Sequence, residues 1–371
     1  MRILQIAIGF EGGIGKLLVD YCTRMKDRIQ FEFLIGQYEN GQYEKKLVEN
    51  GFKVHHIRIG ASKAEKKRVF NTIVSETVFD AVHIHGSCDY ELLKCAKDVN
   101  IKTRIVHSHA ALESTRYKNK IYVALRNSYH DILNSLYVTD KWACGNEAAN
   151  SMWGNKAVLQ KKVFIMPNAV NTKHFAFSAE WAERIRRELH ISKDELVIGT
   201  VGRLTYQKNH SYMIDVMRSL KQNHSHFTLM LIGSGELESE LKEKAKRYRV
   251  YDNILWLGNR DDVPVLLNAM DVFVLTSHFE GLPVVMMEAQ ANGLRCVVSD
   301  AVTRECDFLD GNQYLSLEAG PEKWAVTIAQ TANMGRAEKP AKILQEHGYE
   351  LNNAVDVVFE EYTRAVNRND K

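Results

Sequence analysis

Short apolar runs rich in β-branched residues alternate with longer stretches of helical period along most of the chain. In the first half these runs are Ile3–Ile8, Phe31–Ile35, Val54–Ile57, Ala81–Ile84 and Arg104–Val106. They resume after residue 190 as Leu196–Val201, Phe227–Ile232, Ile254–Leu257, Val272–Leu275 and Cys296–Val298. Strands that alternate with helices form parallel, doubly wound sheets. The pattern therefore predicts an α/β protein with two Rossmann-like domains.

The restart of the pattern places the domain boundary between residues 168 and 192. We expect a first domain over residues 1–170, a second over residues 171–350 and a C-terminal helix over residues 351–371. A chain of 371 residues is too long for one compact hydrophobic core of ordinary size, so two domains are expected. A cleft is then expected between them.

The chain beyond Pro340 is predicted to be helical to its end. Val355, Val358, Phe359 and Tyr362 fall on one face of such a helix, because residues three and four apart lie on the same side. We expect this closing helix to pack back on the first domain.

Composition narrows the class of protein. Charged residues make up 26% of the chain and the formal net charge is +3, which gives no sign of a nucleic-acid partner. The cysteines are scattered, without the spacing of a zinc site, and are predicted to be reduced thiols of a cytoplasmic protein. Met1–Phe10 is predicted to be a first buried strand and not a signal peptide, and no apolar run approaches the roughly 20 residues of a membrane span.

Two carboxylates bracket a predicted helix start in the segment from Glu280 to Glu288. Pro283 suits the first helical position, where its missing N–H costs nothing, and the first-turn amides would then face Glu280. An anion can dock at such amides. With Glu280 in the loop and Glu288 in the second turn, the two would hold different parts of one phosphate-bearing ligand and would not form an acid–base pair.

A pair of cations follows the strand Leu196–Val201 in the run Gly202-Arg203-Leu204-Thr205-Tyr206-Gln207-Lys208. Arg203 and Lys208 can hold a diphosphate and stabilise the charge that grows on it as it leaves. Such a pair usually lies on a solvated surface and has no specific role, but its place in the same domain as Glu280 favours a functional role. Gly233, in the turn after the next strand, is equally consistent with an ordinary turn and with a phosphate cradle.

A glycine-dense turn containing Gly12 and Gly13 follows the first strand. Its spacing matches neither a Walker loop nor a dinucleotide fingerprint. Glycine lets the backbone approach a ligand closely, although a tight turn alone would also explain it.

Two histidine pairs, His83/His85 and His107/His109, end consecutive predicted strands. Alternate residues of a strand share a face, so one histidine of each pair can reach the cleft. His109 is the first candidate for this position, and His85 is a candidate on the acceptor side. The imidazoles could equally be satisfied by backbone carbonyls. A metal ion would need further ligands that the sequence does not offer in a recognisable spacing, so no metal is expected.

Together these motifs resemble glycosyltransferase family 4, a group of retaining, nucleotide-sugar-dependent enzymes with the two-domain GT-B fold. The resemblance spans nearly the whole chain. It is carried chiefly by the Glu280-Gly281-Leu282-Pro283 to Glu288 segment and by Gly202-Arg203-Leu204 with Gln207-Lys208-Asn209. His107-Ser108-His109 and Val298-Ser299-Asp300 are most similar to the transferases that build bacterial capsular polysaccharides and exopolysaccharides.

The resemblance implies roles for individual residues. Arg203 and Lys208 would contact the diphosphate, Glu288 would bind the ribose, and Glu280 would meet the donor sugar. The nucleotide-sugar-binding residues implied are Gly12, Gly13, Gly202, Arg203, Lys208, Gly233, Arg260, Glu280, Gly281, Leu282 and Glu288. The catalytic residues implied are Glu280, His109, Arg203 and Lys208.

The implied reaction is transfer, with retention, of a hexose or N-acetylhexosamine from a nucleotide diphosphate sugar, for which a UDP-sugar is the first choice. The acceptor would be a hydroxyl of a lipid-linked or growing glycan in bacterial surface polysaccharide synthesis. No cofactor is expected, because no Asp-x-Asp pair lies where it could hold Mg²⁺ against phosphates. Two alternatives remain open: a sugar-nucleotide epimerase of the same fold, and a catalytically silent partner subunit that binds nucleotide sugar or glycan.

Residues 116–126 mix cations with aromatic and aliphatic residues at helical spacing. Such a helix can lie on an anionic membrane surface and admit a lipid acceptor, which would make the protein peripheral on the inner face of the cytoplasmic membrane. An ordinary amphipathic helix packed on the first sheet would show the same pattern. The sequence does not specify the donor sugar, the acceptor or the oligomeric state.

Overall fold

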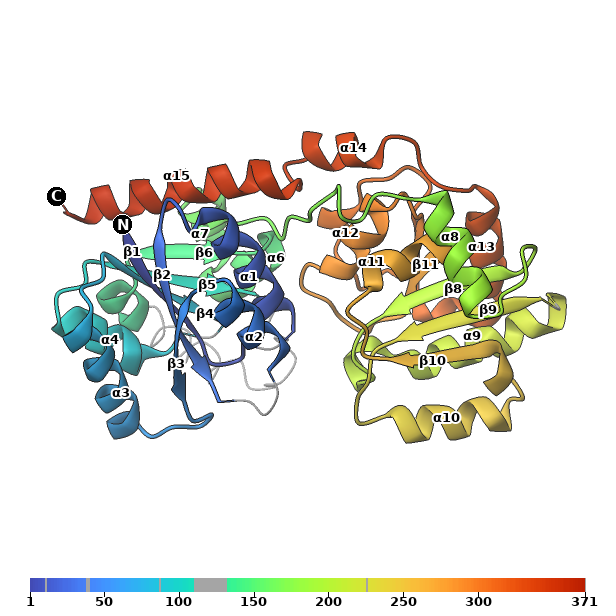
Figure 1. Ribbon diagram of the computed structural model, residues 1–371, viewed down its shortest axis with the longest axis horizontal. Helices are drawn as coiled ribbons and strands as arrows, with labels where there is room; N and C mark the ends of the chain where they lie inside the picture. The colour runs from blue at the N-terminus through green and yellow to red at the C-terminus, as the bar shows by residue number, and fades with distance from the viewer. Residues whose placement is uncertain (11, 38–40, 87, 110–131, 225, 371) are drawn as a thin grey trace. The chain divides into compact units, whose positions relative to one another are not determined.

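The chain folds into two compact units, each built on one parallel sheet (Figure 1). The computed structural model describes all residues except 11, 38–40, 87, 110–131, 225 and 371. The first unit comprises Met1–Asn168 and Asn352–Lys371, and the second comprises Ala169–Leu351. The predicted α/β class with two parallel sheets is confirmed.

The sheet of the first unit has, among the described residues, the strand order β3-β2-β1-β4-β5-β6-β7. The strands are β1 (Arg2–Ala7), β2 (Gln30–Gly36), β3 (Lys53–Ile57), β4 (Ala81–His85), β5 (Thr103–Ser108), β6 (Asp140–Ala143) and β7 (Val163–Ile165). The apolar runs predicted β1 to β5, and β6 and β7 were missed. Strands of four and three residues are too short to show a period.

Helices surround this sheet (Figure 1). They are α1 (Gly13–Met25), α2 (Gln42–Glu49), α3 (Lys63–Glu76), α4 (Tyr90–Asp98), α6 (Asn146–Trp153), α7 (Asn155–Leu159) and α15 (Leu351–Asp370). The amphipathic segment at residues 116–126 lies outside the described residues. Within the part of the chain that the structure describes, no helix is both long and apolar enough to cross a membrane.

The chain beyond Pro340 is not continuously helical, as the sequence predicted, but forms two helices, of which α15 (Leu351–Asp370) corresponds to the C-terminal helix expected over residues 351–371. Helix α14 (Pro340–Glu346) ends before Gly348, which has a φ of 81° that favours glycine. An isolated parallel bridge from Val170 to Glu350 then separates α14 from α15. Within α15, Val355, Val358 and Tyr362 are buried, as the periodicity predicted. Phe359 is only partly buried, under the guanidinium group of Arg28.

The second unit has, in its described part, the strand order β10-β9-β8-β11-β12-β13. The strands are β8 (Leu196–Val201), β9 (Phe227–Ile232), β10 (Ile254–Gly258), β11 (Val272–Leu275), β12 (Cys296–Ser299) and β13 (Gln313–Leu315). Only β13, again three residues long, was missed. The helices are α8 (Ala179–Glu188), α9 (His210–Asn223), α10 (Glu238–Arg247), α11 (Val263–Leu266), α12 (Val284–Ala291), α13 (Pro321–Asn333) and α14, with short 3₁₀ turns at Tyr206–Lys208, Tyr251–Asn253, Leu267–Ala269, Arg304–Cys306 and Leu317–Ala319.

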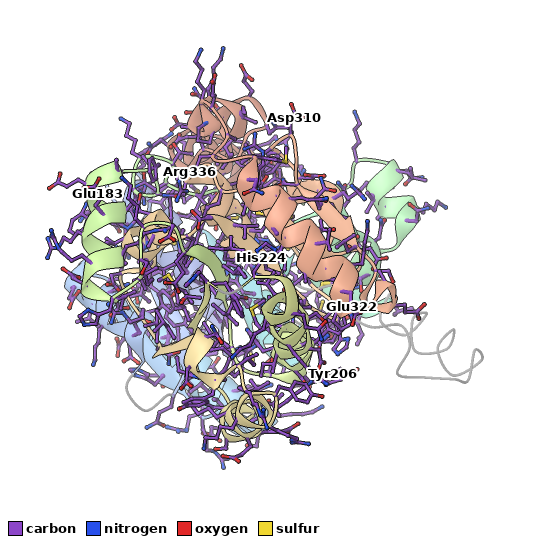
Figure 2. The ribbon with its side chains drawn as sticks, turned by 90° about the vertical axis from the view of Figure 1, so that its right-hand side faces the viewer. Glu183, Tyr206, His224, Asp310, Glu322 and Arg336 are labelled. Carbon is purple, nitrogen blue, oxygen red and sulfur yellow. The ribbon has the colours of Figure 1, made fainter. Side chains whose placement is uncertain are left out.

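A half-buried arginine in the segment that follows α13 contacts the turn before β11. Arg336, labelled in Figure 2, donates to the carbonyl oxygens of Leu267, Asn268 and Met270 at 2.8–3.1 Å. Burial lowers its pKa to about 10. Backbone carbonyl groups in a protein interior require such donors, and these bonds attach the turn to the segment that carries Arg336.

Candidate active site

Three loops of the second unit meet at the carboxyl ends of neighbouring strands β8, β9 and β10. Gly233 N donates to Gly258 O at 2.8 Å, and Gly202 N donates to Ile232 O at 2.9 Å. A Cβ atom on Gly233 would lie 2.0 Å from Gly202 O, and the φ of Gly233 is 135°. Close packing therefore explains Gly233 without a ligand, while Gly202 faces the Lys208 side chain, 3.2 Å from where its Cβ would be.

Lys208 and Glu280 form an ion pair in this unit. Lys208 Nζ lies 2.6 Å from Glu280 Oε1, and the side chains are 16% and 6% exposed. Ser277 Oγ donates to the same oxygen at 2.6 Å, and Gln207 Nε2 lies 3.4 Å from Oε2. The carboxylate is thus held by groups from two loops, which fixes its position.

The same two loops are joined by main-chain contacts. His278 N donates to Gln207 O at 2.8 Å, and Thr276 Oγ1 donates to Asn209 O at 3.0 Å. The ring of Tyr206 stacks on that of His278 with centroids 4.5 Å apart, and Tyr206 lies at the surface of the unit in Figure 2. The loop that carries Lys208 is therefore attached to the loop that carries Glu280.

Arg203 differs from Lys208 in its surroundings. Its side chain is exposed and has no hydrogen bond or ion pair among the described residues. Its neighbour Leu204 is fully buried and bonded through its main chain to Ser234 and Leu237. The backbone at this position is consequently fixed while the guanidinium group remains available to a ligand.

Helix α12 starts one residue later than the sequence predicted. Pro283 has a ψ of 102°, which is extended, and it caps the helix that begins at Val284. Glu288 is buried in the second turn of this helix, and Glu280 lies in the preceding loop. Leu282 is also buried, whereas Gly281 is partly exposed. The two carboxylates therefore belong to different elements.

Arg260 lies in the loop after β10. It is exposed and forms a two-pronged ion pair with Asp262, with N···O distances of 2.7 and 2.6 Å. This contact raises the pKa of Arg260 and lowers that of Asp262. An exposed pair of this kind contributes little stability, so a ligand can displace it readily.

In the glycine-dense turn of the first unit, Gly12, Gly13 and Gly15 have different roles. Gly12 has a φ of 89° and precedes α1, which begins at Gly13. A Cβ on Gly15 would lie 2.3 Å from Phe10 O, whereas Cβ atoms on Gly12 and Gly13 would meet no described residue within 4 Å. Gly15 is thus required for packing, Gly12 is favoured by conformation, and Gly13 leaves open space beside the backbone.

Four histidines share one face of the first sheet. Strands β1, β4 and β5 are neighbours, and the register pairs Gln5 with His83 and His85 with His107. Residues paired across neighbouring strands point to the same face. His83 and His107 are fully buried within their strands, while His85 and His109 lie at the strand ends.

A hydrogen-bond chain connects this histidine cluster to helix α15. His109 Nε2 lies 2.9 Å from His85 Nδ1, and His85 Nε2 lies 2.8 Å from Gln5 Oε1. Gln5 Nε2 donates to Tyr362 Oη at 3.0 Å, and this hydroxyl lies 2.6 Å from His83 Nδ1. Burial lowers the pKa of His109 to about 3 and the pKa values of His83 and His85 well below 6.5. The cluster is therefore neutral at ordinary pH.

His83, His85 and His107 have the spacing of a possible metal site, since one nitrogen of each lies within 4.8 Å of the others. Both nitrogens of His85 are already hydrogen-bonded, to His109 and to Gln5. A metal ion at this trio would have to break one of those bonds.

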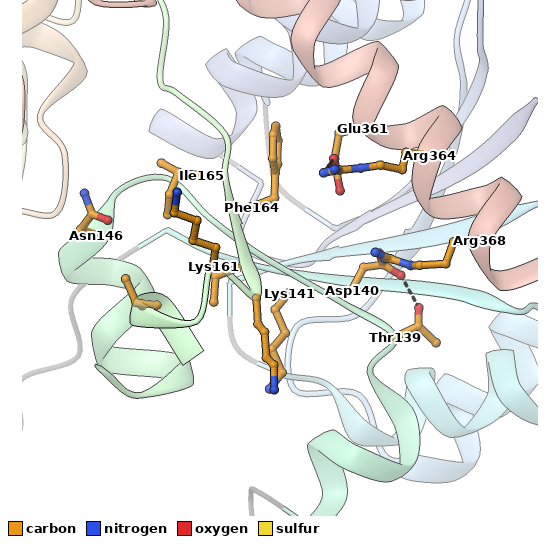
Figure 3. Close-up of a pocket in the computed structure, with 13 residues that line it drawn as sticks. Thr139, Asp140, Lys141, Asn146, Lys161, Phe164, Ile165, Glu361, Arg364 and Arg368 are labelled. Atoms are coloured by element: carbon orange, nitrogen blue, oxygen red, sulfur yellow. Dashed lines mark hydrogen bonds and ion pairs between the residues drawn. The ribbon is translucent and has the colours of Figure 1, made fainter. Parts of the chain in front are cut away.

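A pocket of about 770 Å³ opens at the edge strand β7 of the first unit, beside α15 (Figure 3). It is lined by cations, among them Lys141 and Lys161, and by two carboxylates. Asp140 is paired with Arg368, and Glu361 with Arg364. None of the predicted site residues lines this pocket.

The structure adds contacts by residues to which the sequence assigned no role. Ser277 and Gln207 hold Glu280, and Gln5 links His85 to Tyr362. Gln5 did carry a signal, because it is a polar residue within the otherwise apolar run Ile3–Ile8.

Comparison with known proteins identifies the class of this fold and site. The family described as "Glycosyl transferases group 1" matches residues 182–346. A putative glycosyltransferase of Bacillus subtilis, EpsF, is 30% identical over 370 residues, which cover 97% of this chain and 96% of EpsF. The chain therefore belongs to the group 1 glycosyl transferases, family 4, whose members are retaining enzymes, and it is a glycosyltransferase.

Two further comparisons bear on fold and pathway. HepE of Anabaena, solved in complex with UDP-glucose, superimposes with a TM-score of 0.77 at 18% identity, over 98% of this chain and 100% of HepE. This likeness confirms the GT-B fold. A UDP-Gal:α-D-GlcNAc-diphosphoundecaprenol α-1,3-galactosyltransferase of Escherichia coli is 30% identical over 239 residues, which cover 63% of this chain and 61% of that enzyme.

Proposed function

We propose that this glycosyltransferase moves a hexose or N-acetylhexosamine from a UDP-sugar to a hydroxyl of a lipid-linked or growing glycan, in the synthesis of a bacterial surface polysaccharide. The names of three relatives support this direction. EpsF is a putative glycosyltransferase, the Escherichia coli relative uses UDP-Gal and a diphosphoundecaprenol acceptor, and CapH of Staphylococcus aureus, 23% identical over 86% of each chain, serves capsular polysaccharide biosynthesis.

The observation that carries the proposal is the Lys208–Glu280 ion pair, together with the exposed Arg203 in the same loop as Lys208. An ammonium group has three N–H donors, and Glu280 engages it from one side. Lys208 can therefore remain anchored to Glu280 and donate to a diphosphate oxygen. Arg203, which is exposed and without a partner among the described residues, supplies a second, planar set of donors suited to phosphate.

Helix α12 and its preceding loop are proposed to bind the rest of the donor. The first turn of any helix presents N–H groups that can bind a phosphate. Glu280 and the amides of Gly281 and Leu282 would contact the sugar and its phosphate, and Glu288 would accept hydrogen bonds from the ribose.

Further contacts are assigned to loops at the strand ends. The Arg260 loop would lie against the base, with the Asp262 pair exchanged for contacts to the nucleotide. Gly202, Gly233, Gly12 and Gly13 would let the backbone approach the diphosphate, and among these only Gly13 has neither a close neighbour nor a positive φ to explain it.

The proposed reaction is a displacement on one face of the sugar. The bond from the anomeric carbon to the phosphate oxygen breaks, and its electron pair leaves with UDP. The acceptor oxygen bonds to the same face, and its proton passes to the departing diphosphate. Arg203 and Lys208 stabilise the negative charge that develops on the diphosphate, and His109 contacts the transferred sugar. Glu280 Oε1 is engaged by Lys208 and Ser277, and the proposed displacement uses Glu280 to position the donor and not as a nucleophile.

The test is a panel of UDP-sugars assayed for UDP release and for labelled product, with and without a crude lipid-linked acceptor fraction. We expect one UDP-sugar to give acceptor-dependent UDP release and a glycolipid product with retained configuration. UDP release without a glycosylated product, or conversion to an isomeric sugar, would instead support the epimerase. Binding without any turnover would support the silent subunit.

A further inference from the structure

Gln5 lies at the centre of the hydrogen-bond chain that ends at His109. Its amide contacts His85 on one side and Tyr362 on the other, at 2.8 and 3.0 Å. Gln5 is fully buried in β1, where a polar side chain is stable only if its hydrogen bonds are made. The amide has one donor end and one acceptor end, so its orientation gives the chain a direction.

The protons along the chain follow from this orientation. Gln5 Oε1 can only accept, so His85 Nε2 must donate the hydrogen bond to it. Because burial lowers the pKa of His85 well below 6.5, its ring carries a single proton and Nδ1 is an acceptor. His109 Nε2 must then donate to His85 Nδ1 across their 2.9 Å contact.

The other nitrogen of His109 is the end of the chain. His109 is also neutral, with a pKa lowered by burial to about 3, so with its proton on Nε2 the Nδ1 atom carries a lone pair. Among the described residues Nδ1 has no hydrogen-bond partner. The ring of His107 stacks on that of His109, with centroids 4.0 Å apart and an angle of 26°, and this stacking restricts the orientation of the His109 ring.

The geometry points to Gln5 as the residue that sets the tautomer of His109: acting through His85, it keeps the proton on Nε2 and leaves Nδ1 to accept a hydrogen bond from a hydroxyl of the transferred sugar. Gln5 and His85 are positioning residues in this arrangement. The sugar contact rests on the proposed function, whereas the tautomer does not.

Tyr362 from α15 holds the far side of the Gln5 amide. Its hydroxyl accepts from Gln5 Nε2 and donates to His83 Nδ1 at 2.6 Å. The C-terminal helix thus supports a group at the opposite end of the chain sequence, 357 residues from Gln5. If the amide were reversed, the direction of every proton would change, and His109 would carry its proton on Nδ1.

The decisive measurement is the ¹⁵N spectrum of histidine-labelled protein, which distinguishes protonated from unprotonated ring nitrogens. The His109 signals are assigned by their loss in His109→Asn. In the wild-type protein we expect His109 to carry its proton on Nε2, with Nδ1 unprotonated. A proton on Nδ1 would overturn the assignment without any further variant.

Gln5→Met tests the role of the amide, because methionine is similar in size and makes neither hydrogen bond. We expect the two tautomers of His109 to become mixed and kcat/KM to fall about 10- to 100-fold, as for other residues that orient a functional histidine. Tyr21→Phe is the matched control, since it removes a buried hydroxyl that donates to Pro167 O at 2.6 Å and is not a member of the hydrogen-bond chain from Tyr362 through Gln5 and His85 to His109. It should retain the wild-type spectrum and a near wild-type kcat/KM.

Deoxy analogues of the donor test the sugar contact. With the wild-type enzyme, one deoxy analogue should have a lower kcat/KM than the complete donor. With Gln5→Met, the same analogue should show no comparable decrease. An unchanged His109 spectrum in Gln5→Met, or a loss of kcat/KM equal to that of Tyr21→Phe, would overturn the inference. If the spectrum is as expected but no UDP-sugar is turned over, the proposed function fails and the tautomer assignment stands.

Discussion

The two units share an all-parallel architecture, yet their polar clusters are built from opposite kinds of groups. The first unit joins Gln5, His85 and Tyr362 in a buried chain of neutral hydrogen bonds. The second unit holds a charged pair, Lys208 with Glu280, beside the exposed Arg203. One cluster avoids charge and the other concentrates it.

This difference follows from burial. Neutral imidazole, amide and phenol groups can lie in a core when their hydrogen bonds are made, whereas a buried charge requires a partner of opposite sign. In the proposed reaction the second unit meets the diphosphate and needs positive charge. The first unit would meet hydroxyl groups, for which a neutral acceptor is sufficient. The contrast predicts different responses to pH and to substitution.

The largest expected difference between the two units is in how their stability changes with pH. The folded pKa values of His83, His85, His107 and His109 all lie below 6.5, because burial disfavours the charged form. The unfolded chain therefore binds more protons below pH 6.5, and stability that is complete above pH 6.5 is lost as the pH falls towards 4. With four such groups the loss approaches about 5 kcal/mol per pH unit, at about 1.4 kcal/mol for each.

The second unit provides the internal reference for this experiment. In its described part, His210 alone has a strongly lowered histidine pKa, of about 4. Urea unfolding at pH 7, 6 and 5, followed by pulsed hydrogen exchange and read peptide by peptide, should show the first unit losing stability faster. Equal loss in the two units would mean that the histidines are protonated in the folded state.

Lys208→Ala should have the largest effect of any single substitution at the charged site. Removing Lys208 leaves Glu280 buried without its cation, which costs about 3–5 kcal/mol of unfolding free energy. It should also raise the reaction barrier by about 2–4 kcal/mol, through loss of charge stabilisation on the diphosphate. Adding Glu280→Gln should recover stability without recovering kcat.

Lys244→Ala is the matched control. It breaks another ion pair of the second unit, with Asp215 at 2.8 Å, and neither residue is a predicted site residue. We expect it to leave kcat/KM near the wild-type value. A comparable loss of activity in both variants would show that Lys208 acts only through stability.

Arg203→Ala should separate catalysis from stability. Its barrier should rise by about 2–4 kcal/mol, as for Lys208. Because the side chain is exposed and has no hydrogen bond or ion pair with a described residue, its unfolding free energy should change by no more than about 0.5 kcal/mol. Arg187→Ala, which removes another exposed arginine of the same unit, is the control in steady-state kinetics and urea unfolding. Near wild-type turnover in Arg203→Ala would exclude the diphosphate role.

The longer strands could be predicted from sequence, and so could the positions of the site residues relative to the strand ends. The apolar runs gave β8, β9 and β11 with their observed bounds, because buried parallel strands are continuous apolar segments between polar turns. They could not give β6, β7 or β13, which are too short. The predicted start of α12 was wrong by one residue. Pro283 has an extended ψ and precedes the helix, and the preference of proline for helix starts does not distinguish this position from the first helical one.

The contacts between side chains could not be predicted. Lys208 and Glu280 are 72 residues apart, and Gln5 and Tyr362 are 357 apart. Their pairing depends on which strands become neighbours, and a single sequence does not report that. The family resemblance predicted separate ligand contacts for Lys208 and Glu280, whereas the structure shows that they also contact each other.

Removing divalent metal ions should have the smallest effect. Lys208 and Arg203 are proposed to supply the charge that Mg²⁺ supplies in other transferases, and both nitrogens of His85 are occupied by hydrogen bonds. UDP release should therefore be the same with EDTA as with added Mg²⁺ or Mn²⁺, and Zn²⁺ should not raise the melting temperature. Loss of activity in EDTA that Mg²⁺ restores would place a metal ion at the diphosphate. In that case Lys208→Ala should raise the reaction barrier by less than about 2 kcal/mol, because the metal ion would already supply part of the charge stabilisation.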